Sequence, residues 1–124
     1  MVKNSRKRET IRTILKNTDT HPSAETIYLQ VKNVYPNISL GTVYRNLNQL
    51  IELGEIEKVS GTVGSDRFDG NPKPHNHFFC TCCDAIMDLP DLDGVNVEKE
   101  MQKQFQGRIT GHVTNYYGTC PNCM

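Results

Sequence analysis

Two C-x-x-C pairs constrain the fold of this chain more than any other feature of its sequence. Cys80 and Cys83 form the first pair, and Cys120 and Cys123 form the second, close to the C-terminus. Four thiolates placed about 2.3 Å from one ion make a closed tetrahedral zinc site. A zinc ion bound by both pairs would tie the middle of the chain to its end. The same motif also serves redox dithiols, but no βαβ pattern precedes either pair, so the sequence favours structural zinc.

All five cysteines lie in the second half of the 124-residue chain. In a reducing cytosol, cysteines at this spacing bind metal rather than form disulfides. The first residues, MVKNSRKRET, contain no apolar stretch, and no segment has the length and apolarity of a membrane span. We therefore expect a cytoplasmic protein without a membrane partner. Cys82 belongs to neither pair, and we expect a small buried side chain there rather than an alternative ligand or an oxidisable thiol.

The stretch 69–74, DGNPKP, separates two parts of the chain because its prolines and glycine interrupt any regular element. We expect one domain over residues 1–70 and a second over 71–124. Domains this small need a metal ion or a partner subunit to be stable. Basic and acidic residues number 14 each, so the net charge gives no argument for a nucleic-acid partner.

The first half has the pattern of three helices followed by a hairpin. Apolar residues recur at helical spacing over 8–16, and Ser23 and Ser39 are typical N-caps for a second and a third helix. Gly54 is a typical stop for the third helix. The segment 55–69 then reads as two short strands around a glycine-containing turn. This order predicts a winged helix-turn-helix.

In such an arrangement the third helix would lie in the major groove of DNA. Its polar face carries side chains able to bond base edges, with Tyr44 at the border and Arg45 and Asn48 in the middle. Basic residues of the N-terminal segment, including Arg6 and Arg8, could contact the flanking phosphates. The alternative is an ordinary solvated helix face beside a basic terminus, because any exposed helix carries polar residues.

The second half predicts two strands, a helix and a third strand. The segment 77–90 indicates two strands joined at the first cysteine pair, and 93–105 has helical spacing, with Asp93 as the expected N-cap and Gly107 as the stop. The segment 108–117 alternates as a strand. A unit this small has an exposed sheet edge and an underfilled core, so we expect it to form a homodimer through the sheet.

His75 and His77 indicate a second metal site, because residues two apart share one face of an extended segment. Asp69 precedes them and Asp88 follows them. Imidazole and carboxylate ligands together suit iron(II), manganese(II) or zinc. Two histidines can also fall close together in a polar loop by chance, and the spacing alone leaves that alternative open.

Six segments taken together resemble the ferric-uptake-regulator family of bacterial metal-dependent transcription factors. In chain order they are HPSAETIY, ISLGTVYRNLNQL, SDRFDG, HNHFFCTCC, IMDL and YYGTCPNC, and the resemblance covers essentially residues 5–124. It implies an α+β protein with an N-terminal winged helix-turn-helix domain and a small α/β dimerisation domain that carries a structural zinc site. It also implies a homodimer that binds a double-stranded DNA operator as a repressor.

The resemblance also assigns ligands to two metals. The structural zinc ligands would be Cys80, Cys83, Cys120 and Cys123. A regulatory iron(II) or manganese(II) ion at the domain junction would be bound by His21, Asp69, His75, His77 and Asp88. Tyr44 and Arg45 fall on the recognition helix, where the tyrosine of the family contacts bases.

Aspartate at both 69 and 88 most resembles the peroxide-sensing branch of the family, in which His21 and His75 would be the oxidation targets. The alternative is a repressor of iron or other divalent-metal uptake that does not sense peroxide. His112 matches a histidine of a further metal site, where Asn76 replaces an acidic ligand found in some members.

Two functions of other classes fit single features of the sequence. A zinc hydrolase could use His75, His77 and an acid around an open coordination position, but the chain has no H-E-x-x-H or nucleophile motif. A zinc-stabilised protein-interaction module would need no DNA, and DNA binding would separate it from a repressor. We expect neither an enzyme nor a small-molecule substrate.

Overall fold

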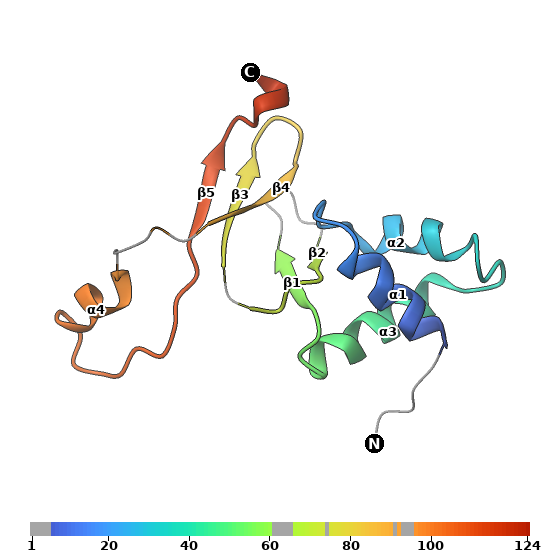
Figure 1. Cartoon of the computed structure of the whole chain (residues 1–124), viewed down its shortest axis with the longest axis horizontal. Helices are drawn as coiled ribbons and strands as arrows, with labels where there is room; N and C mark the ends of the chain where they lie inside the picture. The colour runs from blue at the N-terminus through green and yellow to red at the C-terminus, as the bar shows by residue number, and fades with distance from the viewer. Residues whose placement is uncertain (1–5, 61–65, 74, 91, 93–95) are drawn as a thin grey trace.

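The computed structural model describes residues 6–60, 66–73, 75–90, 92 and 96–124, and Figure 1 shows a helical half beside a half built around a small sheet. The described helices are α1 (Arg6–Lys16), α2 (Ala24–Val31), α3 (Leu40–Glu52), α4 (Val97–Gln102) and the 3-10 turn η1 (Pro121–Cys123). The described strands are β1 (Glu57–Ser60), β2 (Asp66–Asp69), β3 (Asn76–Cys80), β4 (Ile86–Leu89) and β5 (Asn115–Gly118). The predicted α+β class is confirmed.

The second and third helices begin after the serines that the sequence predicts as N-caps, and the first begins at Arg6, earlier than the predicted range 8–16. The hydroxyl of Ser23 accepts a hydrogen bond from the backbone N–H of Thr26, and Ser39 does the same for Thr42. Such caps satisfy backbone donors that have no partner within the helix. Gly54 has a φ of 72°, in the left-handed region that glycine adopts without strain, and it follows the last turn of α3.

A single apolar core joins the three helices and the hairpin. Its buried members are Ile11, Leu15, Ala24, Ile27, Val31, Ile38, Val43, Leu47, Leu50, Ile56 and Phe68. Each aliphatic or aromatic side chain removed from water in this way stabilises the fold by about 1.5–3 kcal/mol. Because α3 contributes Val43, Leu47 and Leu50 to this core, its opposite face is left to solvent.

The hairpin of β1 and β2 connects the two halves. The strands pair antiparallel, with Glu57 directly opposite Asp69. Phe68 of β2 packs into the helical core, whereas Val59 of β1 packs against Phe79 and Ile86 of the second half. The predicted glycine-containing turn falls on residues 61–65, which lie outside the described residues. The hairpin therefore contacts the core on one side and the second sheet on the other.

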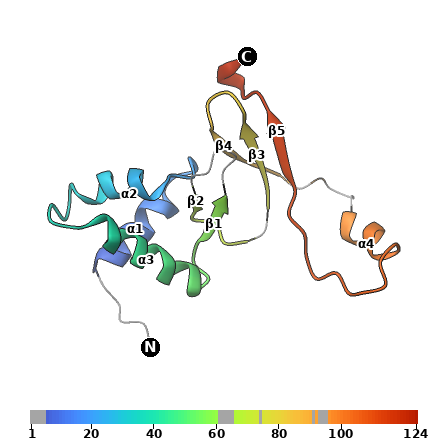
Figure 2. The ribbon, with the colours of Figure 1, turned by 180° about the vertical axis from the view of Figure 1, so that it is seen from behind.

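The second sheet has the strand order β4-β3-β5, with β4 antiparallel and β5 parallel to β3. The parallel pairing places Gly118 of β5 opposite Cys80 of β3. The last residues of the chain therefore lie beside the turn that follows β3. In Figure 2, seen from behind, the C-terminus lies above the sheet and α4 lies on the side away from the three N-terminal helices.

In the second half, the predicted helix over 93–105 and the predicted strand over 108–117 are both longer than the observed elements. The helix is shorter than 93–105 and is capped by Asn96, whose side chain accepts a hydrogen bond of 2.9 Å from the backbone N–H of Lys99. Asp93, the expected cap, lies outside the described residues. The last strand begins only at Asn115 rather than at 108. The amide of Gln102 bonds the backbone of Phe105, Gly107 and Ile109, which folds the chain back after α4 before it can pair with β3.

None of the described helices combines the length and the apolarity that crossing a membrane requires.

Candidate metal centres

The four cysteines of the C-x-x-C pairs come together in the second half. Cys80 ends β3, Cys83 lies in the turn that follows it, Cys120 precedes η1, and Cys123 is the last residue of η1. All four sulfurs lie within 4.8 Å of one another, and Cys83 Sγ is 3.7 Å from Cys120 Sγ. Metal–sulfur bonds of about 2.3 Å in a tetrahedron place sulfurs about 3.8 Å apart. The cluster therefore fits a structural zinc ion.

Backbone hydrogen bonds hold this cysteine cluster in place. Thr81 N–H donates to the carbonyl of Gly118, and Asp84 N–H donates to the carbonyl of Cys80, with Asp84 in the left-handed region at a φ of 62°. Cys120 N–H donates to the sulfur of Cys80 at 3.4 Å. The turn after β3 and the C-terminal segment are thus hydrogen-bonded to each other at the cysteine cluster.

The charges of the thiols show why this cluster needs a cation. The backbone N–H groups of Cys120 and Cys83 lower the pKa of the Cys80 thiol to about 6. The neighbouring thiols, that of Cys120 first, raise the pKa of the Cys123 thiol. One thiolate forms readily, but each further thiolate is opposed by those beside it. A zinc ion supplies the positive charge that allows all four to lose their protons.

Cys82 does not have the environment that we predicted for it. Its side chain is exposed, not buried, although it lies between Cys80 and Cys83. The turn after β3 leaves Cys82 at the solvent-exposed edge of the cysteine cluster, where its thiol still lies close enough to that of Cys123 to raise the pKa of Cys123.

The second cluster consists of His21, Asp69, His75, His77 and Asp88. One ligand atom from each lies within 4.8 Å of all the others. His21 lies in the loop between α1 and α2, Asp69 ends β2, and the other three belong to or precede the second sheet. The cluster is therefore built from both halves of the molecule.

Three imidazole nitrogens of this cluster converge on two carboxylate oxygens. Asp88 Oδ1 lies 2.8 Å from the Nε2 atoms of His21 and His75 and 3.3 Å from that of His77. Asp69 Oδ2 lies 2.8 Å from His75 Nε2 and 3.2 Å from the other two. His21, Asp69 and His77 are buried, whereas the side chain of Asp88 is 42 % exposed. Oxygen and nitrogen donors in this number suit iron(II) or manganese(II).

Backbone carbonyls fix the orientation of two of the histidine rings. His21 Nδ1 donates to the carbonyl of Ile86 at 3.0 Å, and His75 Nδ1 donates to the carbonyl of Lys73 at 2.6 Å. With the proton on Nδ1, the lone pair of Nε2 faces the cluster and can bind a metal. His21 also has a φ of 54°, a conformation that costs energy in a residue with a Cβ and persists only where the surroundings enforce it.

Asp69 is positioned by a glycine that follows it. Gly70 lies so close to the backbone of Leu15 in α1 that a Cβ at this position would clash with the Leu15 carbonyl. The backbone N–H of Asn71 donates to Asp69 Oδ1 at 2.9 Å. Gly70 and the carbonyls of Ile86 and Lys73 are not among the predicted site residues. The DG dipeptide at 69–70 is a signal for Gly70, whereas a carbonyl has no sequence signal.

The pKa shifts in this cluster favour charged histidines paired with charged aspartates. Burial lowers the pKa of His21, but the carboxylates of Asp69 and Asp88 outweigh it, and the net shift is upward. Burial acts in the same direction on His75, where the Lys73 carbonyl and the two carboxylates again raise the pKa. Burial raises the pKa of Asp69, but hydrogen bonds, that from His21 first, hold it well below its usual range. A divalent cation would replace protons here.

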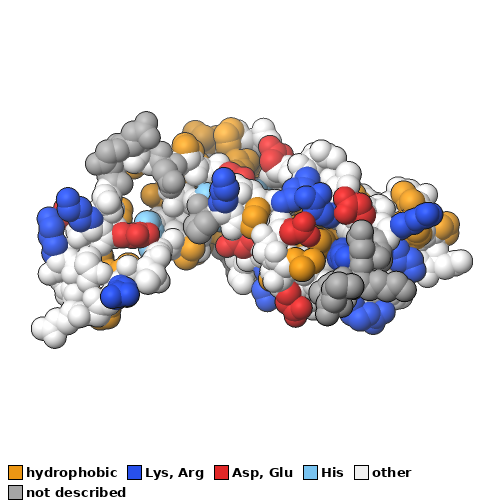
Figure 3. Space-filling view, turned by 60° about the horizontal axis from the view of Figure 1, so that its bottom comes forward, with side chains coloured by type: hydrophobic (Ala, Val, Ile, Leu, Met, Phe, Trp, Pro, Cys, Tyr) orange, Lys and Arg blue, Asp and Glu red, His pale blue; other side chains and the backbone are white. Residues whose placement is uncertain are grey.

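The candidate DNA contacts Tyr44, Arg45 and Asn48 are exposed on α3, and Arg6 is exposed at the start of α1. Two of them already have partners within the chain. The hydroxyl of Tyr44 donates to Glu25 Oε1 at 3.2 Å, and Arg45 Nη2 donates to Thr42 Oγ1 at 2.8 Å. Figure 3 shows Lys and Arg side chains over the helical half with acidic side chains between them, in keeping with the balanced charge.

The structure corrects the prediction for Arg8. This residue is 7 % exposed, and its Nη1 donates to Gln49 Oε1 of α3 at 3.3 Å. Arg8 precedes Ile11 and Leu15 at helical spacing, so it lies on the face of α1 that packs against α3. It links the two helices and is not presented to a phosphate.

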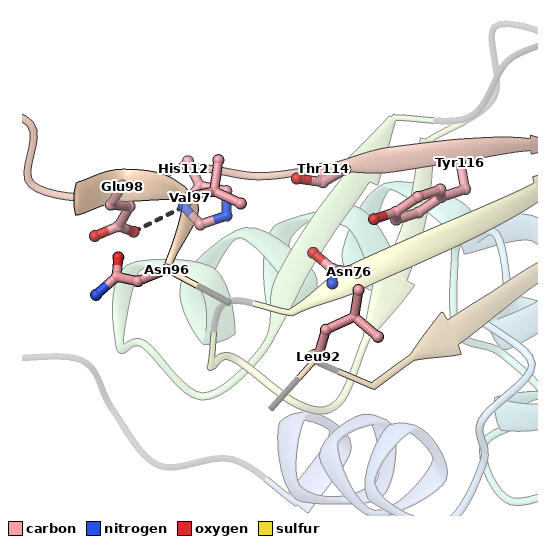
Figure 4. Close-up of a pocket in the computed structure, with 8 residues that line it drawn as sticks. All are labelled: Asn76, Leu92, Asn96, Val97, Glu98, His112, Thr114 and Tyr116. Atoms are coloured by element: carbon pink, nitrogen blue, oxygen red, sulfur yellow. Dashed lines mark hydrogen bonds and ion pairs between the residues drawn. The ribbon is translucent and has the colours of Figure 1, made fainter. Parts of the chain in front are cut away.

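His112 lies in a different pocket, drawn in Figure 4. Its Nδ1 pairs with Glu98 Oε1 at 2.8 Å, and the two line a pocket of about 250 Å³ together with Asn76. Within the described residues, only the cysteine cluster and the His/Asp cluster bring three or more His, Cys, Asp or Glu ligand atoms together. The further metal site that His112 suggested is therefore incomplete among these residues.

Comparison with known proteins gives a consistent result. A family model described as the ferric uptake regulator family matches residues 1–117. The ferric uptake regulation protein of Bacillus subtilis (strain 168) is 34 % identical over 118 residues, which are 92 % of this chain and 79 % of that protein. The peroxide-responsive repressor PerR of Staphylococcus aureus (strain USA300) is 33 % identical over 119 residues, 94 % of this chain and 79 % of that one.

Among solved structures, the ferric uptake regulator Fur of Helicobacter pylori superposes with a TM-score of 0.87 at 28 % identity, over 98 % of this chain and 82 % of that one. Its description reports three functional metal binding sites. Together with the topology, this likeness confirms the predicted winged-helix half and small α/β half with a site suited to structural zinc.

Proposed function

Since the chain belongs to the ferric uptake regulator family, whose members are metal-responsive transcription regulators rather than enzymes, we propose that it is a repressor that senses peroxide. The sensor is an iron(II) or manganese(II) ion bound by His21, Asp69, His75, His77 and Asp88. The protein acts in the cytoplasm as a homodimer on a double-stranded DNA operator, with domains at 1–70 and 71–124.

The observation that carries this proposal is the position of the His/Asp cluster between the two halves. His21 belongs to the helical half, and His77 and Asp88 belong to the second sheet. A metal bound by both halves fixes the angle between them. In a dimer that angle sets the distance between the two α3 helices, which must match half-sites about one helical turn apart. Metal binding and DNA binding then strengthen each other by linkage.

The structural zinc ion has a different role in this proposal. Its ligands Cys80, Cys83, Cys120 and Cys123 all lie in the second half, and it keeps the sheet and the C-terminus together. The dimer forms through this half, where Tyr116 and Tyr117 of β5 and Val97 and Met101 of α4 are exposed. Apolar side chains left in contact with water on a small unit favour association with a second copy.

DNA is contacted by α3 and the start of α1. Tyr44, Arg45 and Asn48 read base edges, and Arg6 contacts phosphate. In the complex, Arg45 exchanges its bond to Thr42 for a bond to a base, and Tyr44 exchanges its bond to Glu25.

Peroxide sensing is supported by the donor atoms of the cluster and by the two aspartates. The site holds no thiolate, and iron(II) bound by oxygen and nitrogen ligands is reactive toward peroxide. His21 and His75 make shorter contacts to Asp88 than His77 does and are the oxidation targets. When one imidazole gains one oxygen atom, peroxide is reduced to water, and the modified ring is a poor ligand. The two halves then lose their connection and the repressor leaves DNA.

A repressor of metal uptake is the second candidate, favoured by the 34 % identity to the Bacillus subtilis ferric uptake regulation protein. A gel shift with the DNA upstream of the protein's own gene separates the two. Mild peroxide should release the iron-loaded protein but not the manganese-loaded protein. Mass spectrometry should find one added oxygen on a peptide containing His21 or His75, with methionine oxidation localised and subtracted. Iron-loaded protein that stays on DNA after peroxide would identify the metal-uptake repressor.

A further inference from the structure

Glu57 is an acidic residue beside the His/Asp cluster that the proposed ligand set does not include. It is the first residue of β1 and pairs directly with Asp69 of β2. Side chains directly opposite each other in an antiparallel pair lie on the same face, with Cβ atoms about 4.5–5.5 Å apart. Glu57 and Asp69 are therefore neighbouring carboxylates, an arrangement that is unfavourable unless a cation lies near both.

One oxygen of Glu57 lacks any partner. Oε2 is the one buried side-chain nitrogen or oxygen, among all residues that the structure describes, without a hydrogen bond. Burying a carboxylate oxygen without a donor or a cation is costly, and proteins rarely leave such an atom unsatisfied. An orphan oxygen of this kind indicates that something outside the described chain satisfies it.

The basic side chains near Glu57 in the hairpin have other partners. Lys58 Nζ lies 3.8 Å from Asp66 Oδ2. Arg67 donates to the carbonyls of His21 and Asp84. Neither side chain pairs with Glu57 among the ion pairs of the described residues, and a cation bound by the His/Asp cluster would add positive charge on this side of the hairpin.

Glu57 shares a small cavity with two histidines of the cluster. The cavity has a volume of about 140 Å³, and Lys58, Val59, Phe79 and Asn115 are among the residues that line it together with Glu57, His75 and His77. A space of this size holds water molecules, each of which takes up roughly 30 Å³. Glu57 lies outside the group of atoms within 4.8 Å that would bind the metal directly. Water in the cavity could therefore connect its carboxylate to a metal ion.

We propose that Glu57 is a further acidic residue of the His/Asp cluster. It acts on the bound divalent cation through water, from outside the five direct ligands. This inference rests on the proposed function. If a cation held by the five ligands also binds water, the carboxylate of Glu57 would accept a hydrogen bond from that water. The third carboxylate also adds negative charge that raises the affinity of the site for a cation.

The test is the affinity of the zinc-loaded protein for Mn(II), measured by isothermal titration calorimetry in wild type and in Glu57→Gln. Glutamine keeps the shape and removes the charge, so the affinity should fall on the order of tenfold. Asp66→Asn is the matched control, because it removes one charge from the same hairpin at an exposed position and should change the affinity less than about twofold. Glu57→Asp keeps the charge and should stay closer to wild type than Glu57→Gln.

Thermal unfolding without Mn(II) gives a second readout that a purely structural role would not produce. Glu57→Gln should melt at a higher temperature than wild type, because it removes an unpaired carboxylate beside Asp69, and should gain less from saturating Mn(II). Equal Mn(II) affinities for Glu57→Gln and Asp66→Asn would overturn the inference and leave the proposed function standing. A lower melting temperature without loss of affinity would also overturn it. Failure of the wild type to bind Mn(II) would overturn both.

Discussion

The two candidate metal centres differ in what they connect. The four cysteines all belong to the second half and join the turn after β3 to the C-terminus. The five residues of the His/Asp cluster come from the loop after α1, from the hairpin and from the second sheet. A metal held within one half stabilises that half, whereas a metal held between halves controls their relative position. The difference predicts one permanent metal for assembly and one exchangeable metal for regulation.

The two centres also differ in how they behave without metal. In the cysteine cluster, neighbouring thiols raise the pKa of Cys123, so without zinc this thiol keeps its proton and is a neutral group with little attraction to the others. In the His/Asp cluster, protonated imidazoles can pair with Asp69 and Asp88. Charged imidazoles and carboxylates can therefore hold the His/Asp cluster together without a metal, whereas neutral thiols cannot do so at the cysteines. This makes loss of zinc more disruptive than loss of the regulatory metal.

The largest effect should come from Cys123→Ser. Loss of one thiolate should abolish tight zinc binding, destabilise the second half by on the order of 3 kcal/mol or more, and give monomer or aggregate. Zinc analysis and size-exclusion chromatography with light scattering measure both consequences. Cys82→Ser is the control, since Cys82 is exposed and outside the cluster, and it should behave nearly as wild type. A zinc-free Cys123→Ser dimer with a normal melting temperature would contradict the role given to this centre.

The next effect should come from His21→Ala. It removes the ligand contributed by the loop after α1, so Mn(II) affinity should fall by about a hundredfold or more, while zinc content and the dimer stay intact. DNA binding should then no longer respond to Mn(II). His112→Ala removes an imidazole outside the cluster and should retain the response. Loss of zinc or of the dimer in His21→Ala would show that the two centres are not independent.

The sequence predicted the cysteine centre better than the His/Asp centre, for a physical reason. Each C-x-x-C pair is local, so its geometry is largely set by one turn. His21 reaches the cluster only because its φ is 54° and the Ile86 carbonyl bonds its ring, which are consequences of tertiary packing. Spacing along the chain indicated His75 and His77, and the family resemblance supplied His21 and Asp69.

The same distinction between local and tertiary signals explains which parts of the fold could be predicted from the sequence. Ser23, Ser39 and Gly54 are local signals, and they correctly predicted the starts of α2 and α3 and the end of α3. The strand expected over 108–117 is short because Gln102 bonds the backbone that follows α4, a contact that no periodicity reveals. Arg8 was misread because its charge suggested solvent while its position on α1 faces Gln49.

A smaller effect should follow from changes on α3, which lies apart from both centres. Arg45→Ala should weaken operator binding by about 1–3 kcal/mol and relax the sequence preference. Arg6→Ala should weaken binding to all sequences alike and reduce the salt slope by about one. Fluorescence anisotropy at several salt concentrations distinguishes the two, and both variants should keep wild-type zinc and Mn(II) binding. The reverse pattern would mean that α3 is not the helix in the groove.

The smallest effect should be the response of the metal-free His/Asp cluster to pH, and its sign follows from the direction of each pKa shift. His21 and His75 have raised pKa values in the folded protein, so their contribution to stability is fully present below about pH 6.5, the unfolded value, and is lost as the pH rises through the folded values. Asp69, whose pKa is lowered, contributes stability above about pH 3.9 that is lost only as the pH falls through its folded value.

Between pH 6 and 8, therefore, the histidine contribution to the stability of the zinc-loaded protein without Mn(II) should decrease. Mn(II) must displace the protons, so its affinity should increase over the same range. His75→Gln in the metal-free protein should reduce the pH dependence of the melting temperature, and His112→Gln is the matched control because His112 is an imidazole outside the cluster. A Mn(II) affinity that does not change between pH 6 and 8 would show that protons do not occupy the junction in the absence of metal.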